Sequence, residues 1–351
     1  DTPRAFGLFV ISTRYFPANL MNVVSAGPFV PLSILSICTI NSWPSLSISF
    51  ILLFLSKVSF FRYSLEISFK GRKPCLSAPK STNAASKLGS PTTMLDTLGD
   101  DWQSEIIINE LKSIGVSCDE IIIEVGAKAS LASVLIRKSD GARAIRFVRS
   151  TAKAISHGAI TKEIISQHKI VHCNGRHINA CLKAASECKA VDSEHFMSFD
   201  GGAGRYREEL LPLMKGIDMA IVAKDFASKL SGLNDLNSEV WSCMKKAFPK
   251  AKILGITDGI KGSWFLNEDE TTFHQPAYYV PVTVDTTGCG DVYHGAFLNG
   301  ILRNLSVKES AKIASAAGAL NAMKIGGRGN LVNNDRLNIF LREAKEIQPR
   351  P

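Results

Sequence analysis

The stretch Asp285-Thr286-Thr287-Gly288-Cys289-Gly290-Asp291 carries the clearest chemistry in this sequence. It follows a strand-like run, Tyr278–Val284, and leads into an apolar segment of helical length, Asp291–Arg303. Two glycines around one small residue let a backbone approach a ligand closely. The start of a helix offers unpaired N–H groups and the positive end of the helix dipole. The stretch therefore predicts an anion-binding loop at a helix N-terminus.

Asp291 lies at the end of this loop. A carboxylate beside an anion site can take the proton from a hydroxyl group held there, which is the task of a general base in phosphoryl transfer. The competing interpretation is a glycine-rich turn in which Asp291 only caps the helix. The loop alone leaves both interpretations open.

A second glycine-containing turn, Thr257-Asp258-Gly259-Ile260-Lys261-Gly262, follows the predicted strand Lys252–Thr257. An antiparallel hairpin is predicted after it, over 263–275. The predicted helix Val307–Ile325 carries a run of small residues, and these permit either close helix packing or a flat purine pocket. They are Ala311, Ala314, Ala316, Ala317, Gly318 and Ala319.

Strand-like and helix-like segments alternate from about residue 88. The further predicted strands are Thr92–Leu98, Glu120–Val125, Leu131–Ile136, Ala144–Val148, Lys169–Cys173, Phe196–Phe199 and Met219–Val222. The further predicted helices are Trp102–Ile114, His177–Glu187 and Arg207–Met214. Repeated strand-then-helix units predict an α/β fold with a mostly parallel sheet covered by helices on both faces. Ligands of such folds bind in the loops at the carboxyl ends of the strands.

The charge of the chain is unevenly distributed. The 351 residues carry a net charge of +9, and residues 1–80 hold eight basic and two acidic side chains, so six of the nine charges lie there. The remaining domain is nearly neutral, which argues against nucleic-acid binding. The eight cysteines include no CxxC pair, so free thiols are expected, with Cys181 and Cys188 in or beside one helix.

Residues 15–56 contain no charged side chain. Proline and serine interrupt their apolar runs before any run reaches the roughly 20 residues of a membrane-spanning helix. A poorly structured extension, or one that is not native to the fold, is expected, with a membrane-attached segment as the alternative. We therefore divide the chain into an atypical Ser-rich extension, 1–80, an α/β domain, 81–340, and a tail, 341–351.

Together these motifs resemble the ribokinase-like carbohydrate kinases, or PfkB family, over about residues 88–335. The family signature D-T-x-G-A-G-D-x-F matches Asp285–Asp291 with Cys289 in place of Ala and Tyr293 in place of Phe, and 257–262 resembles the T-x-G-x-x-G nucleotide turn. The resemblance implies a three-layer α/β/α sandwich with a small β lid. Two segments look most like the ketohexokinase branch, His172-Cys173-Asn174-Gly175-Arg176 and Ala223-Lys224-Asp225-Phe226-Ala227.

The resemblance also implies roles for individual residues. Asp291 would be the catalytic base, with the anion hole formed by the amides of Gly288, Cys289 and Gly290. The nucleotide would be bordered by Thr257, Gly259, Gly262, Gly318, Asn321 and Ala322. The substrate would contact Asn174, Arg176 and Asp291. ATP would bring Mg²⁺, and a monovalent cation such as K⁺ would lie by Asp285 and Thr287.

The chain departs from the family pattern in three places. The N-x-x-E element is replaced by Ala223-Lys224-Asp225-Phe226. Counting back from Ser86-Lys87-Leu88-Gly89 places Lys80 where relatives have the Asn of G-G-x-x-x-N. No first strand with a sugar-binding Asp is found in 1–75. We call residues 220–335 the phosphate half of the site, which keeps the pattern except at 223–226, and the segments before it the sugar half, which does not keep it.

The sequence therefore predicts an ATP-dependent kinase of a small sugar such as fructose or a pentose. A nucleoside kinase of the same fold, and a relative that binds nucleotide without turnover, are the alternatives. A cytoplasmic location and no nucleic-acid partner are expected. Relatives often dimerise through the lid, but part of that lid comes from the N-terminal region, so a homodimer is not favoured here.

Overall fold

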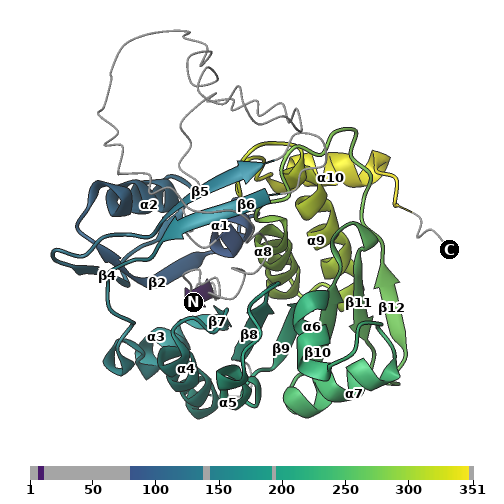
Figure 1. Ribbon diagram of the computed structural model, residues 1–351, viewed down its shortest axis with the longest axis horizontal. Coiled ribbons are helices and arrows are strands. Elements are labelled where there is room, and N and C mark those ends of the chain that lie inside the picture. Colours follow the sequence, from purple (N-terminus) through teal and green to yellow (C-terminus); the bar gives the residue numbers. More distant parts are fainter. Residues whose placement is uncertain (1–6, 12–79, 137–142, 192–194, 348–351) are drawn as a thin grey trace, which may run out of the picture. The chain divides into compact units, whose positions relative to one another are not determined.

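The computed structural model describes residues 7–11, 80–136, 143–191 and 195–347 (Figure 1). The strands are β1 Gly7–Ile11, β2 Thr92–Gly99, β3 Val116–Ser117, β4 Ile121–Glu124, β5 Leu131–Ile136, β6 Arg143–Val148, β7 His168–Cys173, β8 Phe196–Gly201, β9 Met219–Ala223, β10 Ile253–Thr257, β11 Ser263–Leu266 and β12 Thr272–Gln275. The α-helices are α1 Lys80–Lys87, α2 Trp102–Ser113, α3 Lys162–Ser166, α4 Ile178–Val191, α5 Leu211–Met214, α6 Lys224–Ser231, α7 Ser238–Ala247, α8 Cys289–Leu302, α9 Val307–Ala322 and α10 Asn334–Glu343.

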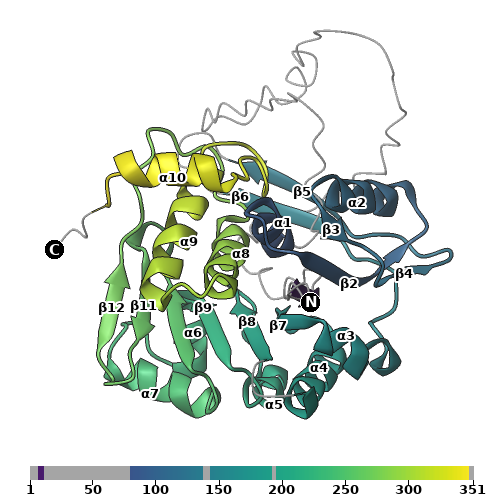
Figure 2. The same cartoon turned by 180° about the vertical axis from the view of Figure 1, so that it is seen from behind.

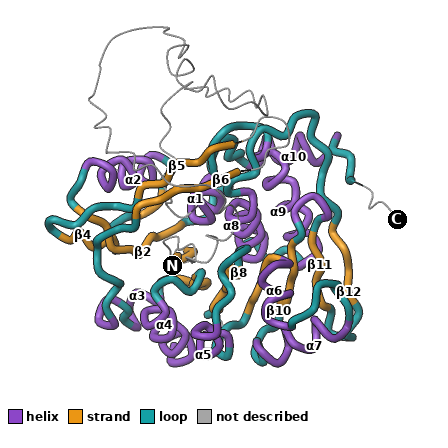
Figure 3. The backbone as a smooth tube through the Cα atoms, viewed as in Figure 1, coloured by secondary structure: helices purple, strands orange, loops and turns teal. Residues whose placement is uncertain are grey.

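The strands of the main sheet follow the order β12-β11-β10-β9-β8-β7-β1-β2-β3, and β4 also pairs with β2. The pairs from β10 through β9, β8, β7 and β1 to β2 are parallel, whereas β11 and β12 form an antiparallel hairpin at one edge. Strands β5 and β6 form a separate antiparallel pair. Figure 3 shows these strands as a layer between helices. The predicted α/β fold with a mostly parallel sheet is confirmed.

Helices cover both faces of the sheet, and each face has its own hydrophobic core. One core joins residues of α1, α2, α8, α9 and α10, and the other joins residues of α3, α4, α5, α6 and α7. Figures 1 and 2 show these two groups on opposite sides of the strands. The arrangement is the three-layer α/β/α sandwich that the family resemblance implied.

Residues 7–11 contribute a central strand that the sequence did not predict. β1 lies between β2 and β7 and runs parallel to both. The division of the chain at residue 80 placed this segment outside the α/β domain, and the first strand that was expected and not found in 1–75 was one bearing a sugar-binding Asp. The strand has only five residues, GLFVI, all of them apolar or glycine, and none is acidic. Such a short strand is not distinguishable by pattern from the apolar region around it. The charge-free stretch 15–56 lies outside the described residues.

Two predicted elements differ from the structure. Tyr278–Val284 is not a strand. Within the described residues it pairs with another segment through one isolated β-bridge, between Tyr278 and Glu346, and the N–H of Val284 donates to Ala322 O in α9. Arg207–Met214 is not one helix but a 3₁₀ turn, Glu208–Leu210, followed by α5, which has Pro212 in its first turn. Within the described ranges, no helix is both long and apolar enough to cross a membrane.

Glycines in α8 bring two other helices close to the site. A Cβ atom on Gly295 would lie 2.1 Å from Ser81 O, and one on Gly300 would lie 2.5 Å from Ser310 Oγ. Any larger residue would therefore push away α1 or α9. Because Ser81 follows the first residue of α1, this contact also sets the position of Lys80 beside the start of α8.

Candidate active site

The loop Asp285–Asp291 ends in a helix start of the expected kind. Gly288 is the N-cap of α8, with a left-handed φ of 78°, and Asp291 lies in the first turn. A Cβ atom on Gly288 would lie 2.4 Å from Gly327 O, so both the conformation and the space require glycine. The interpretation of Asp291 as the N-cap is wrong, because Gly288 holds that position and leaves the Asp291 carboxylate for other contacts.

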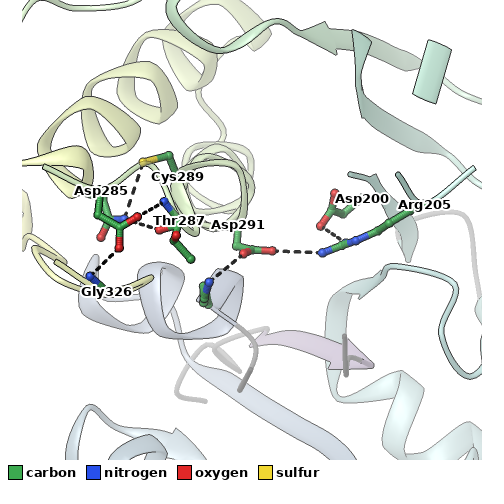
Figure 4. Close-up of polar contacts among 9 residues, drawn as sticks. Asp200, Arg205, Asp285, Thr287, Cys289, Asp291 and Gly326 are labelled. Carbon is green, nitrogen blue, oxygen red and sulfur yellow. Dashed lines mark hydrogen bonds and ion pairs between the residues drawn. The ribbon is translucent and has the colours of Figure 1, made fainter. Parts of the chain in front are cut away.

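Buried polar groups hold this loop in place (Figure 4). Asp285 accepts hydrogen bonds from the N–H groups of Thr287, at 2.8 Å, and Gly326, at 2.9 Å. Asn321 donates to Thr287 O at 3.4 Å. Asp285 is 3% exposed and Asn321 is fully buried, so these bonds are shielded from water. The predicted anion-binding loop is therefore held in place by groups of the chain itself.

The carboxylate of Asp291 lies between two cationic side chains. Lys80 Nζ is 3.6 Å from Asp291 Oδ2, and Arg205 Nη2 is 3.5 Å from Asp291 Oδ1. Lys80 comes from the first position of α1, and Arg205 comes from the loop after β8. Two elements of the sugar half thus meet the proposed base of the phosphate half, and both cations favour its ionised form.

Arg205 continues into a buried polar chain. Its Nη1 donates to Asp200 Oδ2 at 2.7 Å, as Figure 4 shows. The other oxygen of Asp200 lies 3.3 Å from His294 Nε2, and the His294 ring lies 5.5 Å from the ring of His172. His172 Nδ1 is 3.1 Å from the hydroxyl of Ser198. His294 is buried, at 5% exposure.

Burial and charge set the protonation of this chain. Burial lowers the pKa of His172 to about 3, and burial also lowers the pKa of His294. Burial has the largest influence on the pKa of Asp200 and raises it, but Arg205, His294 and His172 together outweigh burial and hold that pKa below its ordinary value. At neutral pH the two histidines are therefore uncharged, while Asp200 and Arg205 form an ion pair.

The strand register explains why these residues meet. Leu95 of β2, Cys173 of β7 and Phe199 of β8 lie in one row across the sheet, linked through Ile11 of β1. One residue further along β2, β7 and β8, the chain places the polar residues Asp96, Asn174 and Asp200. Because these strands are parallel, the three polar residues lie toward the same edge of the sheet and form one polar rim there.

The predicted substrate residues Asn174 and Arg176 lie on this rim beside Asp96. Asn174 Oδ1 accepts the N–H of Arg176 at 3.2 Å, and Arg176 is close enough to Asp96 to act on its charge. His177 Nδ1 accepts the N–H of Ile155, so its ring proton lies on Nε2, 3.4 Å from Asp96 Oδ1. Burial raises the pKa of Asp96. Sequence reasoning missed Asp96, which stands on the strand next to β1.

The predicted nucleotide turn lies at the end of β10. Thr257 is the last residue of that strand, and Gly259 begins a 3₁₀ turn. Gly262 has a φ of 91°, and a Cβ atom there would lie 2.2 Å from Gln275 O, so the turn into the β11–β12 hairpin requires glycine. Ser263 Oγ lies 2.8 Å from the hydroxyl of Tyr293 in α8. The turn is thereby joined to the helix that carries Asp291.

The predicted adenine residues on α9 lie against the anion-binding loop. A Cβ atom on Gly318 would be 3.5 Å from Cys289 O, and Asn321 Nδ2 is 3.8 Å from Cys289 Sγ. Ala322 O accepts the N–H groups of Val284 and Asp285. These contacts show that Asn321 and Ala322 support the loop, and a nucleotide contact stays a prediction for all three residues.

The comparisons with known proteins agree with this geometry. Fructokinase-1 of Oryza sativa subsp. japonica is 27% identical over 264 residues, which are 69% of this chain and 80% of the relative. Arabidopsis thaliana ribokinase complexed with ribose and ATP has a TM-score of 0.63 at 21% identity, over 75% of this chain and 86% of that one. A candidate ribokinase II from E. coli in complex with ATP and Mg²⁺ has a TM-score of 0.66 at 20% identity, over 76% and 89%.

The match to a family model decides to which family the chain belongs. The sequence matches the pfkB family carbohydrate kinase over residues 81–334, from the start of α1 to the start of α10. The solved structures show the ribokinase fold. The closer resemblance to the ketohexokinase branch stays a prediction. Because the family match spans well over half of the sequence, this chain belongs to the pfkB family of carbohydrate kinases.

Proposed function

We propose that this chain transfers the γ-phosphoryl group of ATP to a hydroxyl group of a small sugar, with Asp291 as the general base. The observation that carries the proposal is the position of Asp291. It lies in the first turn of α8, directly after a glycine loop fixed by Asp285, with its carboxylate between Lys80 and Arg205. The fructokinase relatives make fructose the first sugar to test.

In the proposed reaction, Asp291 accepts the proton of the sugar hydroxyl while the hydroxyl oxygen attacks the γ-phosphorus. The helix start offers amide N–H groups to the charge that develops on the phosphoryl oxygens. The amides of Gly288 and Gly290 are the better candidates, because the N–H of Cys289 already donates to Thr286 O at 3.3 Å. Arg205 and its partner Asp200 orient the base.

The residues fit the expected ions in different ways. Among the described residues, no group of three or more His, Cys, Asp or Glu side chains is arranged to hold a metal, which fits Mg²⁺ held mainly by ATP phosphates and water. Thr287 Oγ1 is buried and has no hydrogen-bond partner in the described part of the chain, which fits a K⁺ site with Asp285. Such a site predicts a higher melting temperature in K⁺ than in tetramethylammonium salts, and equal values would contradict it.

The test is ADP release by the full chain with ATP, Mg²⁺ and a panel of sugars and nucleosides, compared with Asp291→Ala. Turnover of one sugar well above that control supports the proposal, and mass spectrometry identifies the phosphorylated product. Turnover of a nucleoside alone would favour the nucleoside kinase. Stabilisation by nucleotide with no turnover of any acceptor would favour a relative that only binds nucleotide.

A further inference from the structure

Lys80 is a buried cation inside the candidate active site. Only 2% of Lys80 is exposed to solvent. Its Nζ lies 3.6 Å from Asp291 Oδ2, which is within ion-pair range but outside the usual hydrogen-bond distance. Lysine is almost never fully buried unless it is paired. Asp291 is thus an ionic partner of Lys80 across a separation longer than a hydrogen bond.

The path of the Lys80 side chain leads to the anion-binding loop. A Cβ atom on Gly288 would lie 2.6 Å from Lys80 Cδ, and one on Gly327 would lie 2.2 Å from both Cε and Nζ. Glycine at both positions therefore leaves the space that this side chain fills. One of the two, Gly288, is the N-cap whose amide belongs to the proposed anion hole, so the ammonium group lies beside the place of the transferred phosphoryl.

The charges around Asp291 change during the proposed reaction. Lys80 and Arg205 are positive, Asp200 and Asp291 are negative, and His172 and His294 are neutral. When Asp291 takes the hydroxyl proton, its negative charge beside Lys80 and Arg205 is lost, at the moment when negative charge collects on the phosphoryl oxygens.

Lys80 and Arg205 differ in their freedom to follow that charge. Arg205 is held by Asp200 at 2.7 Å, closer than its 3.5 Å contact with Asp291. Lys80 carries its charge on a flexible four-carbon stem with three donors. Lys80 is therefore the cation that can move toward the phosphoryl group, whereas Arg205 keeps its place.

We infer that Lys80 is a further catalytic residue, which exchanges its ion pair with Asp291 for one with the transferred phosphoryl group. This inference rests on the proposed kinase function. The hydroxyl proton goes to Asp291, the hydroxyl oxygen bonds to the γ-phosphorus, and the bond from that phosphorus to the β–γ bridging oxygen breaks, with its electron pair leaving on ADP. Lys80 remains protonated and donates to a phosphoryl oxygen.

The test compares Lys80→Met with the wild-type chain and with Lys87→Met. Lys87 lies at the exposed end of the same helix, so it is a matched control for the substitution. For Lys80→Met we expect kcat to fall by about 100-fold or more, which is typical for loss of one group that stabilises developing charge. We expect Lys87→Met to stay within about threefold of wild type, as is usual for an exposed surface change.

Nucleotide affinity gives a readout that does not depend on turnover. Lys80→Met should bind the β,γ-imido analogue of ATP roughly tenfold more weakly, as expected for one lost charge-assisted hydrogen bond, and ADP as wild type does. Equal losses for both nucleotides, or a kcat near that of wild type, would overturn the inference. If Lys80→Met does not fold, Lys80→Gln is measured in the same way. If the wild-type chain phosphorylates none of the acceptors tested, the kinase function is refuted. The two nucleotide affinities would still decide whether Lys80 contacts the γ-phosphoryl group.

Discussion

The phosphate half and the sugar half of the site are built from different materials. In the phosphate half, backbone groups and a helix start form the proposed anion site, and glycines at 262 and 288 shape the loops. In the sugar half, side chains from separate elements meet at the carboxyl-end side of β2, β7 and β8, with Lys80 added from α1. The first half keeps the family pattern except at 223–226, and the second departs from it.

The difference shows which kind of site tolerates change. Backbone amides recognise a phosphate whatever the neighbouring side chains are, so Cys289 can replace Ala in the signature without removing a donor. A rim of side chains depends on the identity of each one. Lys80 at the predicted Asn position introduces a charge beside the base, which alters what that half can bind and do.

Gly288→Ala is expected to have the largest effect, because it breaks the phosphate half. The added Cβ would lie 2.4 Å from Gly327 O and 2.6 Å from Lys80 Cδ. We expect kcat, measured by ADP release, to fall by about 1000-fold, the upper effect of losing an oxyanion donor. Gly232→Ala is the control, since Gly232 has a similar φ of 76° but open space around its Cβ position. Equal losses in both variants would indicate backbone strain alone.

Arg205→Met would break the link between the halves. It leaves the buried Asp200 carboxylate without its 2.7 Å partner, so we expect the free energy of unfolding to drop by about 3 kcal/mol and kcat to fall by about 100-fold. Urea unfolding and ADP release measure the two effects. The double variant Arg205→Met with Asp200→Asn should regain much of the stability but not the turnover. Recovery of both would show that Arg205 does not orient Asp291.

Phe9→Pro tests whether the sugar half includes β1. Proline removes a backbone N–H from a strand that is paired on both sides, so we expect a loss of about 2–4 kcal/mol in urea unfolding. Phe9→Val keeps the N–H and controls for the change of side chain. If Phe9→Pro unfolds like Phe9→Val, residues 7–11 do not belong to the sheet, and the separation of all of 1–80 from the fold stands.

The pH dependence of stability is the smallest expected effect. In the folded chain, burial lowers the pKa of His172 from its ordinary value of 6.5 to about 3. Between these two pH values, the unfolded chain therefore binds a proton that the folded chain does not bind. Stability should therefore fall as the pH drops below about 6.5, by up to about 1.4 kcal/mol per pH unit from this residue. His172→Gln should flatten the profile between pH 6 and 4. An unchanged slope would place the protonation elsewhere.

Much of the fold followed from local pattern. The strands Leu131–Ile136 and Met219–Val222 and the hairpin over 263–275 were predicted within a residue or two, because their apolar spacing and turn residues are contiguous. The prediction of a strand at Tyr278–Val284 was wrong. An apolar run that contains Pro281 is extended and has the sequence pattern of a strand, whether or not a partner strand exists. The strands predicted at 131–136 and 144–148 are present as β5 and β6, which pair with each other.

The site was predictable only where it is continuous in sequence. Asp291 and its glycines stand within seven residues, and their chemistry can be argued from spacing alone. His294 follows Asp291 by three residues and so shares its helix face, a signal that could have identified it. Counting back from Ser86-Lys87-Leu88-Gly89 placed Lys80 at the Asn position of a family motif, but nothing in the spacing indicated that Lys80 would meet Asp291 or that His172 would lie near them.

The sequence by itself thus determined the α/β architecture, the family and the anion-binding loop, because each depends on short-range periodicity or on a contiguous motif. Tertiary structure alone decided that β1 completes the sheet and that Lys80 and Arg205 enclose Asp291. Lys80 and Asp291 are more than 200 residues apart, and only the close packing of α1 on Gly295 of α8 brings them together. Contacts of that kind depend on the relative positions of whole elements, which no local pattern encodes.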